Sequence, residues 1–308
     1  MHQLLADYRA MARIRAVEEA LMSLKTGGEV PGSIHLCNGQ EAIPVGAVRA
    51  LEPGDLVTAT YRGHGWALAR GTDPAALLAE CMGKDSPLNG GRAASPYLSD
   101  PSVGFLGENS IVGAGLPIAA GAALSQQRLR TGKISLVSIG DGALNQGNVS
   151  EGLNLAIVLK LPLVVVVENN VYSEMSPIAD MVGIARLTER AAGFGIPAEQ
   201  VDGNDPQVVH DAVARAAERA RTGGGPTVVE AMTARLVGHY SGDVQHYRPK
   251  GEVEAARAVE PLVRARALLG AAAAAVDDDV RAEVEQAIAA ARSMPEPDPA
   301  SVGEHVHA

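Results

Sequence analysis

Apolar residues recur at intervals of three and four along the start of the chain, which predicts an amphipathic helix over residues 2–25. The positions that share this spacing are Leu4, Leu5, Tyr8, Met11, Ile14, Val17 and Leu21. A second helix is expected over residues 41–51, a short strand over residues 56–60 and a further helix over residues 74–82. Gly- and Pro-containing stretches separate these elements and mark the turns between them.

The middle of the chain alternates between apolar runs and helical patterns. Continuous apolar runs at residues 134–139 and 163–167 predict strands that are buried on both faces, and residues 227–232 predict a third strand. Helices are expected between them, over residues 148–160 and 206–221. Strands and helices in this order form parallel pairs with right-handed crossovers. The pattern therefore predicts an α/β fold with a mostly parallel sheet and helices on both faces.

Residues 83–110 are rich in Gly, Ser, Pro and Asn and show no periodicity. A loop of this length inside a compact domain is often functional. Residues 111–128 are rich in Ala and Gly and are expected to form a helix, whose glycines would let another backbone or chain approach closely.

The C-terminal part is Ala-rich and charged, and it predicts two helices over residues 252–293 and a tail over residues 295–308. We find no internal repeat and no domain boundary in the sequence. The chain is therefore interpreted as a single domain, residues 1–308, with helical extensions at residues 1–50 and 252–294.

Composition narrows the class of protein. Hydrophobic residues make up 46% of the 308 residues, which supports a sizeable core and argues against disorder. The net charge of −10 and the absence of a basic stripe argue against a nucleic-acid binder. No apolar run is long enough to span a bilayer, and the first 15 residues lack the apolar segment of a signal peptide. Cys37 and Cys81 have no metal-ligand spacing, so a soluble, reduced, cytoplasmic protein is expected.

Polar residues follow the two buried central strands. Gly140-Asp141-Gly142 ends the first strand and Glu168-Asn169-Asn170 ends the second. Ligands of doubly wound sheets bind beyond the carboxyl ends of the strands, so Asp141 and Asn170 should lie at one edge. Carboxylate, amide and carbonyl oxygens suit Mg²⁺, and the carbonyl of Tyr172 could supply a third ligand. The N–H groups of Gly142 and Ala143 could meet phosphate oxygens, although Gly-Asp-Gly alone would be equally typical of a simple turn.

The spacing of these two motifs is similar to the thiamine-diphosphate signature, in which GDG is followed by NN about thirty residues later. The text between them resembles the alpha subunit of the decarboxylating component of 2-oxo acid dehydrogenase complexes, a group that includes the pyruvate, branched-chain and acetoin enzymes. Six further stretches resemble motifs of this family, in order along the chain: HLCNGQEA at residues 35–42, YRGHG at 61–65, NSIVGAGLP at 109–117, VDGND at 201–205, GPTVVE at 225–230, and GHYSGD with the following YR at 238–248.

The resemblance implies a thiamine-diphosphate-binding, transketolase-like fold that uses thiamine diphosphate and Mg²⁺. It implies that Asp141, Asn170 and the Tyr172 carbonyl bind the metal. It also implies that Tyr61 and Arg62 reach the diphosphate, in agreement with the match between a guanidinium fork and phosphate oxygens. The full set of residues expected to contact the cofactor is Tyr61, Arg62, Ile111, Val112, Gly140, Asp141, Gly142, Ala143, Asn170, Tyr172 and His239.

Three histidines at motif positions are candidate catalytic residues. His239 is the candidate for acid–base work or for binding substrate charge, with His35 and His64 as its partners in the pocket, because histidine titrates near neutrality. A single histidine is more often structural, and three at motif positions favour function. The resemblance implies that the glutamate that activates the cofactor comes from a beta subunit in an α₂β₂ heterotetramer, and that the acyl group passes to a lipoyl acyltransferase.

The sequence departs from the family pattern at two places. Residues 91–97 read GRAASPY where the family has G[KR]GGSMH, so Tyr97 stands at a histidine position, and Ser110 stands where glycine is usual. The changed loop keeps an alternative open, namely a carboligase or non-oxidative decarboxylase of specialised metabolism; a non-catalytic scaffold subunit is a third possibility. The stretches 191–197 and 238–248 are closer to acetoin dehydrogenases, which favours pyruvate or acetoin as substrate.

Overall fold

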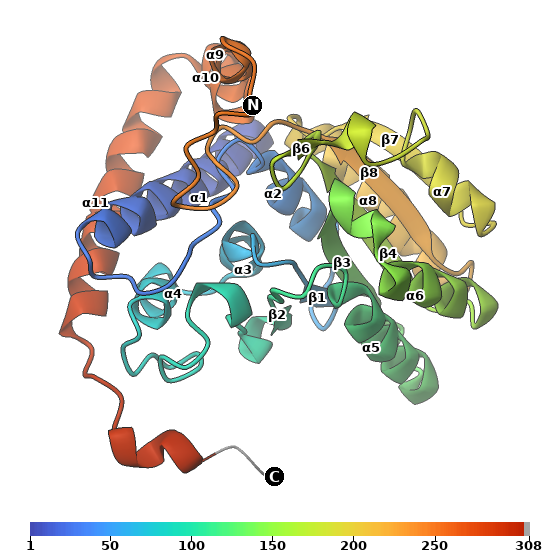
Figure 1. Ribbon diagram of the computed structural model, residues 1–308, viewed down its shortest axis with the longest axis horizontal. Coiled ribbons are helices and arrows are strands. Elements are labelled where there is room, and N and C mark those ends of the chain that lie inside the picture. Colours follow the sequence, from blue (N-terminus) through green and yellow to red (C-terminus); the bar gives the residue numbers. More distant parts are fainter. Residues whose placement is uncertain (305–308) are drawn as a thin grey trace.

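The computed structural model describes residues 1–304 and contains one six-stranded sheet with helices on both faces (Figure 1). The strand order is β2-β1-β3-β4-β8-β7, and every neighbouring pair is parallel. The strands are β1 (Leu56–Thr58), β2 (Phe105–Gly107), β3 (Ser135–Gly140), β4 (Leu163–Asn169), β7 (Ala198–Asp202) and β8 (Thr227–Met232). The predicted α/β fold with a parallel sheet is therefore confirmed.

Side chains of the central strand β4 alternate between two hydrophobic clusters, because successive residues of a strand point to opposite faces of the sheet. Leu163, Val165 and Val167 face the cluster that includes α5 (Gly115–Leu129), α6 (Gly147–Val158) and α7 (Thr188–Gly193). Val164 and Val166 face the other cluster. Its helices are α1 (His2–Thr26), α2 (Ala42–Arg49), α3 (His64–Arg70), α4 (Pro74–Cys81), α8 (Pro206–Arg221), α10 (Pro261–Leu269) and α11 (Ala271–Ser293).

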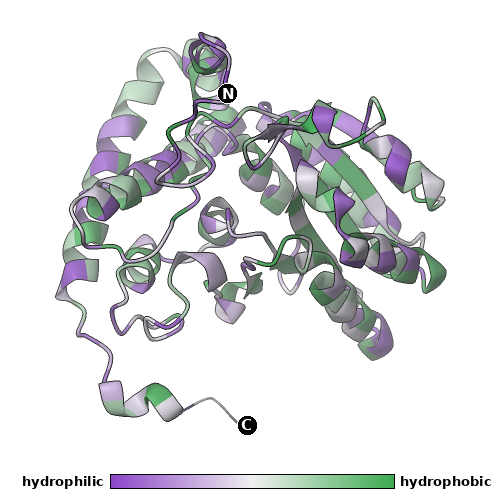
Figure 2. Ribbon diagram, in the orientation of Figure 1, coloured by the Kyte–Doolittle hydropathy of each residue, from purple (hydrophilic) through white to green (hydrophobic). Residues whose placement is uncertain are grey.

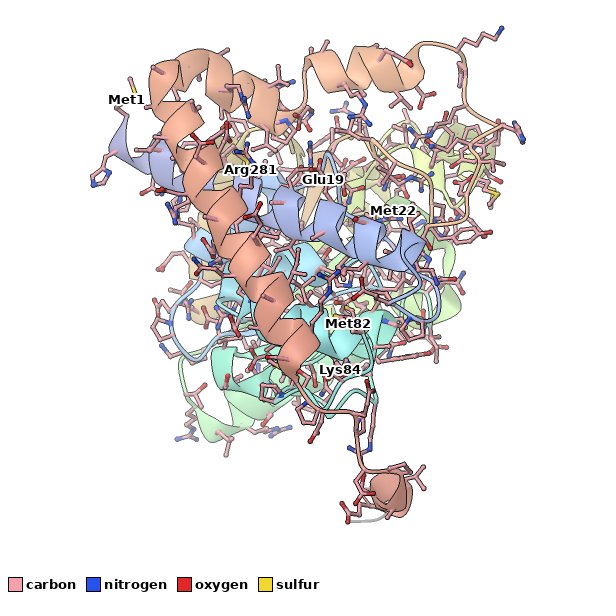
Figure 3. All side chains as sticks on the ribbon, turned by 90° about the vertical axis from the view of Figure 1, so that its left-hand side faces the viewer. Met1, Glu19, Met22, Met82, Lys84 and Arg281 are labelled. Carbon is pink, nitrogen blue, oxygen red and sulfur yellow. The ribbon has the colours of Figure 1, made fainter. Side chains whose placement is uncertain are left out.

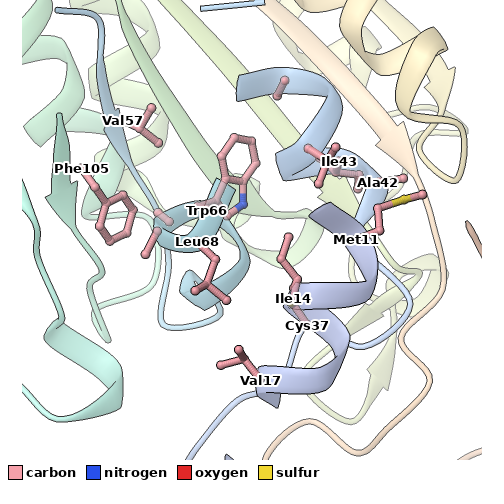
Figure 4. Close-up of a cluster of buried hydrophobic side chains, with 14 of the residues drawn as sticks. Met11, Ile14, Val17, Cys37, Ala42, Ile43, Val57, Trp66, Leu68 and Phe105 are labelled. Atoms are coloured by element: carbon pink, nitrogen blue, oxygen red, sulfur yellow. The ribbon is translucent and has the colours of Figure 1, made fainter. Parts of the chain in front are cut away.

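Hydropathy follows this layering, with hydrophobic residues along the strands and hydrophilic residues on the outward sides of the covering helices (Figure 2). On the second face, residues of α1, α2 and α3 interlock with β1 and β2 (Figure 4). Trp66, the single tryptophan of the chain, lies buried in this cluster.

The first helix and the last long helix of the described chain pack together. Helix α11 lies across α1 (Figure 3), and the Tyr8 hydroxyl of α1 donates to Asp277 of α11 at 2.7 Å. Three helices follow the sheet where two were predicted: α9 (Glu252–Ala258), α10 and α11. The prediction was wrong because Pro261 starts a new helix after the Glu260 cap, and Gly270 at φ 58° ends it. Residues 299–303 form a 3₁₀ turn in the predicted tail, whose last four residues lie outside the described part.

Some elements of the structure were not predicted, because their sequences lack a clear hydrophobic pattern. Strand β2 has three residues, and β7 is an edge strand with half-exposed polar side chains, so neither shows an apolar run. Helix α3 begins inside a glycine-containing motif, and α7 has six residues. The predicted helix over residues 111–128 begins only at Gly115. None of the helices in residues 1–304 is long and apolar enough to cross a membrane.

Candidate functional site

A cavity of about 220 Å³ lies beyond the carboxyl ends of the central strands β3, β4 and β8. It is lined by every residue that the sequence predicts to contact a cofactor except Ile111, namely Tyr61, Arg62, Val112, Gly140, Asp141, Gly142, Ala143, Asn170, Tyr172 and His239. Ile111 is 65% exposed, and its N–H is held in a turn by Asn109 at 2.8 Å. The structure also adds residues that the sequence analysis did not assign to the cofactor: Gln40, Thr60, Gln146, Glu168, Ser173, Glu174 and Arg235.

Asp141 and Asn170 lie on neighbouring strands, because Gly140 of β3 pairs with Glu168 of β4. One carboxylate oxygen of Asp141 accepts from the N–H of Gly142 at 2.7 Å, whereas Oδ2 is buried and has no partner among the described residues. Burial raises the pKa of Asp141 to about 7. A buried carboxylate with a free oxygen is suited to a cation, which would supply the missing partner.

Asn170 is oriented by its neighbours. Its Nδ2 donates to Gln40 at 2.8 Å, and its Oδ1 accepts from the N–H of Tyr172 at 3.2 Å. The adjacent Asn169 has a different task, because its Nδ2 donates to Glu230 of β8 at 2.7 Å and so joins the ends of two strands. The strand ends are thus tied together on both sides of the asparagine pair.

The turn after β3 has room only for glycine at one position. A Cβ at Gly142 would lie 2.3 Å from Oγ of Ser173. The short 3₁₀ helix Asp141–Asn145 begins here, and α6 follows from Gly147. The close approach of the β5 strand (Tyr172–Ser173) to this turn forms one wall of the cavity.

Two arginines face the cavity without a carboxylate partner of their own. Arg62 is 7% exposed and donates to the carbonyls of Leu36 and His239, the latter at 2.9 Å. Arg235 is 2% exposed, and within the described chain its guanidinium bonds go to neutral acceptors: the Val237 and Glu174 carbonyls, the Tyr247 hydroxyl and the imidazole of His239. Burial, reinforced by the charge of Arg62, lowers the pKa of Arg235 to about 10. Two buried cations with neutral partners favour an anionic ligand.

The sequence analysis missed Arg235, although a signal was present. Arg235 follows β8, whose carboxyl end reaches the same edge as the ends of β3 and β4. Applying the strand-end rule to the third strand would have singled out this residue.

Of the three predicted histidines, His35 and His239 lie close together, whereas His64 lies apart from them. The ring of His239 lines the cavity and lies 5.0 Å from the ring of His35 and 5.7 Å from that of Tyr61. His35 packs behind Tyr61, with ring centroids 4.4 Å apart. The expectation that His64 lines the pocket is wrong: its ring is fully buried, with Nδ1 2.9 Å from Glu18 and Nε2 2.9 Å from Ser95. Helix α3 begins at His64 and packs against α1, which turns this side chain away from the cavity.

We expect His35 and His239 to stay neutral between pH 5 and 8, where free histidine changes charge. Burial, followed by the charge of Arg62, lowers the pKa of His35 to about 3 and that of His239 to about 4. Since these folded-state values lie below the unfolded value, the unfolded chain binds more protons in the window between them, and stability falls as the pH drops through it. NMR of histidine-labelled protein, with His35→Gln and His239→Gln for assignment, checks this; a midpoint near 6.5 for either ring would contradict it.

The loop that departs from the expected pattern is held by one carboxylate. Glu80 of α4 accepts the N–H groups of Asn89, Gly91, Ala93 and Ala94 at 2.8–3.3 Å. Gly91 has φ 73°, and a Cβ there would lie 2.5 Å from the carbonyl of Lys84. Tyr97 at the end of this loop is 51% exposed and does not line the cavity.

Comparison with known proteins gives the family. Residues 9–300 match the family described as "Dehydrogenase E1 component". The chain belongs to this family. It is 40% identical to the alpha subunit of acetoin:2,6-dichlorophenolindophenol oxidoreductase of Cupriavidus necator over 304 residues, which cover 96% of this chain and 91% of that one. The corresponding subunit of Bacillus subtilis is 43% identical over 245 residues, which cover 80% and 74% of the two chains. The alpha subunit of the pyruvate dehydrogenase E1 component of Zymomonas mobilis is 38% identical, with 96% and 86% covered.

The family assignment confirms the resemblance to E1 alpha subunits and the thiamine-diphosphate-binding fold that it implied. In this E1 chain the family motifs converge from distant parts of the sequence. Residues of the segment before α2, the segment before α3 and the segment after β8 meet the ends of β3 and β4 at one cavity.

Proposed function

We propose that this E1 alpha subunit binds thiamine diphosphate together with Mg²⁺ and, with a beta subunit, cleaves a small oxo substrate, acetoin or pyruvate, next to its carbonyl carbon. The observation that carries the proposal is that one cavity contains both a group suited to a cation and groups suited to an anion. The buried, unpartnered Oδ2 of Asp141 calls for a cation, and the buried guanidinium groups of Arg62 and Arg235 call for an anion. A metal-bound diphosphate meets both demands.

The donor set fits Mg²⁺ carried by a phosphate ligand. In residues 1–304 no three His, Cys, Asp or Glu side chains gather as a metal site. The ion would therefore rest on one carboxylate, Asp141, on the amide oxygen of Asn170 and the carbonyl of Tyr172, and on oxygens of the ligand itself, as is usual for Mg²⁺. The N–H group of Ala143, in the turn after β3, would face the phosphate oxygens, and that of Gly142, which donates to Asp141 in this structure, would be shared with them.

Bound thiamine diphosphate supplies the nucleophilic carbon and the electron sink that cleavage beside a carbonyl requires. The residues of this chain would orient the cofactor and shield the reacting groups. Arg62 and Arg235 would hold the diphosphate end, while Tyr61 and His239 form the wall on which the substrate end would rest. Neutral His239 can donate a hydrogen bond to substrate oxygen or accept a proton from it, and His35 supports the ring from behind.

The proton transfer that activates the cofactor needs a further carboxylate. Glu168 in the cavity wall is committed, because it accepts from Trp66 at 2.7 Å, from Gln40 at 2.5 Å and from Ser138. As the resemblance to E1 alpha subunits implies, we assign the activating glutamate to the beta subunit of an α₂β₂ heterotetramer. The relatives named as alpha subunits support such a partner.

The outward face of α5 and α6 is the surface we assign to the beta subunit. Ile118, Leu155 and Val158 are exposed there, and a Cβ at Gly121 would meet no atom within 4 Å. The two helices pack tightly, because Leu116 fills the space that the missing side chain of Gly152 leaves. The surface continues to the cavity, since exposed Ile111 and cavity-lining Val112 shortly precede α5. A partner seated on this surface would reach the cofactor.

We expect Ile118→Glu to weaken assembly of alpha with beta by about tenfold or more, because it places a charge in an apolar contact. The matched control is Leu268→Glu on α10, an exposed leucine on a helix of the opposite sheet face. Light scattering of size-separated mixtures measures the fraction assembled. Equal assembly of both variants would remove α5 from the interface.

The acceptor and the substrate are tested on the reconstituted α/β complex with thiamine diphosphate and Mg²⁺. Acetoin and pyruvate are each supplied with 2,6-dichlorophenolindophenol, with a lipoyl acyltransferase domain, or with an aldehyde. Turnover that depends on the dye or the lipoyl domain supports the dehydrogenase. Carbon–carbon bond formation or aldehyde release without either oxidant would instead identify the alternative, a carboligase or non-oxidative decarboxylase, which the altered loop ending at Tyr97 favours.

We also propose a cytoplasmic, reducing setting. Cys37 and Cys81 are both free and buried, as is usual for cysteines of proteins kept in a reduced state.

A further inference from the structure

A buried polar cluster lies directly behind two cavity-lining segments. Glu18 of α1 is fully buried and uses both carboxylate oxygens: Oε2 meets Nδ1 of His64 at 2.9 Å, and Oε1 accepts the N–H of Cys37 at 2.9 Å. On its other side the imidazole meets Oγ of Ser95 at 2.9 Å. Glu18 and Ser95 thus meet on one imidazole that does not line the cavity, and Glu18 also holds the backbone at Cys37.

Two arms of this cluster end close in sequence to Arg62 or to a carbonyl that Arg62 binds. His64 follows Arg62 by two residues, and Cys37 follows Leu36, whose carbonyl accepts from the Arg62 guanidinium. The carboxylate of Glu18 therefore fixes both the backbone that carries Arg62 and the backbone that Arg62 binds.

The third arm reaches the loop held by Glu80. Ser95 is buried, and it follows Ala94, a non-glycine residue at φ 50°. Ser95 begins the short 3₁₀ turn Ser95–Tyr97, so the hydrogen bond to His64 ties the end of the loop to α3.

We infer that His64 is a positioning residue: with Glu18 it sets the place of α3 and thereby the orientation of Arg62, while its bond to Ser95 only anchors the end of the loop 83–98. The inference rests on the proposed function for its consequence, the affinity for thiamine diphosphate. It excludes a direct catalytic role, because the ring is fully buried and is not among the residues that line the cavity.

Two conservative substitutions of His64 test its hydrogen bonds to Glu18 and to Ser95 separately. Asparagine at position 64 places an amide nitrogen near the former Nδ1 and can still donate to Glu18. Glutamine places its amide near the former Nε2 and can still form a hydrogen bond with Ser95. Glu18 then loses the hydrogen bond that it made with the former Nδ1. We expect His64→Gln to raise the dissociation constant for thiamine diphosphate with Mg²⁺ about tenfold or more, the usual scale for loss of a supporting contact. His64→Asn should stay within about threefold of the original protein, and Ser95→Ala should resemble it.

Calorimetry of the α/β complex measures these constants, and kcat at saturating cofactor should change less than the cofactor affinity. Trp66 supplies a readout that needs no cofactor, because it lies in α3 (Figure 4) and its Nε1 donates to Glu168 in the cavity wall. The emission of the cofactor-free complex, with the Trp66→Phe spectrum subtracted, should shift in His64→Gln and not in His64→Asn.

The outcomes are distinguishable. Failure of the original protein to bind thiamine diphosphate would overturn the proposed function, while the Trp66 emission would still decide whether His64 sets α3. If His64→Gln and His64→Asn give the same affinity and the same emission, the positioning role is overturned. If His64→Gln lowers only the thermal midpoint, the cluster is structural and the inference is likewise overturned.

Discussion

Replacing Asp141 by alanine is expected to lower kcat/KM of the α/β complex by roughly 1,000-fold and to abolish calorimetric binding of thiamine diphosphate with Mg²⁺. Asp141 is the one carboxylate among the three groups assigned to the ion, and its free Oδ2 is buried in the cavity. Without it the diphosphate would have to enter with an uncompensated charge or a poorly held cation.

The same substitution should leave the cofactor-free complex at least as stable as the original. Burial raises the pKa of Asp141 to about 7, so the folded protein holds this carboxylate in an environment that disfavours its charge. Asp141→Asn removes the charge at nearly constant shape and should behave in the same way. The exposed Asp211 of α8 supplies the control, Asp211→Ala, with unchanged affinity. Thermal unfolding with and without cofactor measures both effects, and a lowered midpoint in the cofactor-free state would argue for a structural role.

Arg235→Met is expected to raise the dissociation constant for thiamine diphosphate about 100-fold, and Arg62→Met to act in the same direction. Each removes a buried guanidinium that has no carboxylate to neutralise it, so the lost interaction belongs to the ligand rather than to the fold. Arg235→Lys should recover only part of the affinity, because an ammonium cannot present a planar fork to phosphate oxygens.

Arg221, an arginine with a structural role, is the control for this test. Arg221 binds the buried Asp55 through both guanidinium nitrogens, and Asp55 also accepts the N–H of Ile134 just before β3, at the opposite end of the sheet. Arg221→Met should therefore lower the thermal midpoint and leave cofactor affinity unchanged, since it strands a buried carboxylate. If Arg235→Met behaves like Arg221→Met, the assignment of Arg235 to the diphosphate fails.

The sequence predicted the positions of site residues at strand ends better than the positions of site residues that lie elsewhere in the family motifs. Asp141 and Asn170 were located because a buried parallel strand is a nearly continuous apolar run, and its carboxyl end is where ligands bind. Ile111 and His64 also occur in family motifs, yet one is exposed and the other faces α1. A motif identifies a residue, whereas the direction of its side chain depends on where the local helix begins.

The sequence by itself determined the parallel α/β fold and the family, and it predicted that Asp141 and Asn170 lie together, since each depends on periodicity, on strand ends or on residues close together in the chain. Only the tertiary structure decided that Arg235 lines the same cavity as Arg62, that His35 stacks behind Tyr61, and that Glu18 joins His64 to Cys37. Arg62 and Arg235, the most distant of these pairs, lie 173 residues apart in the chain. Their geometry is fixed by how the helices pack on the sheet, and no local pattern in the chain records that packing.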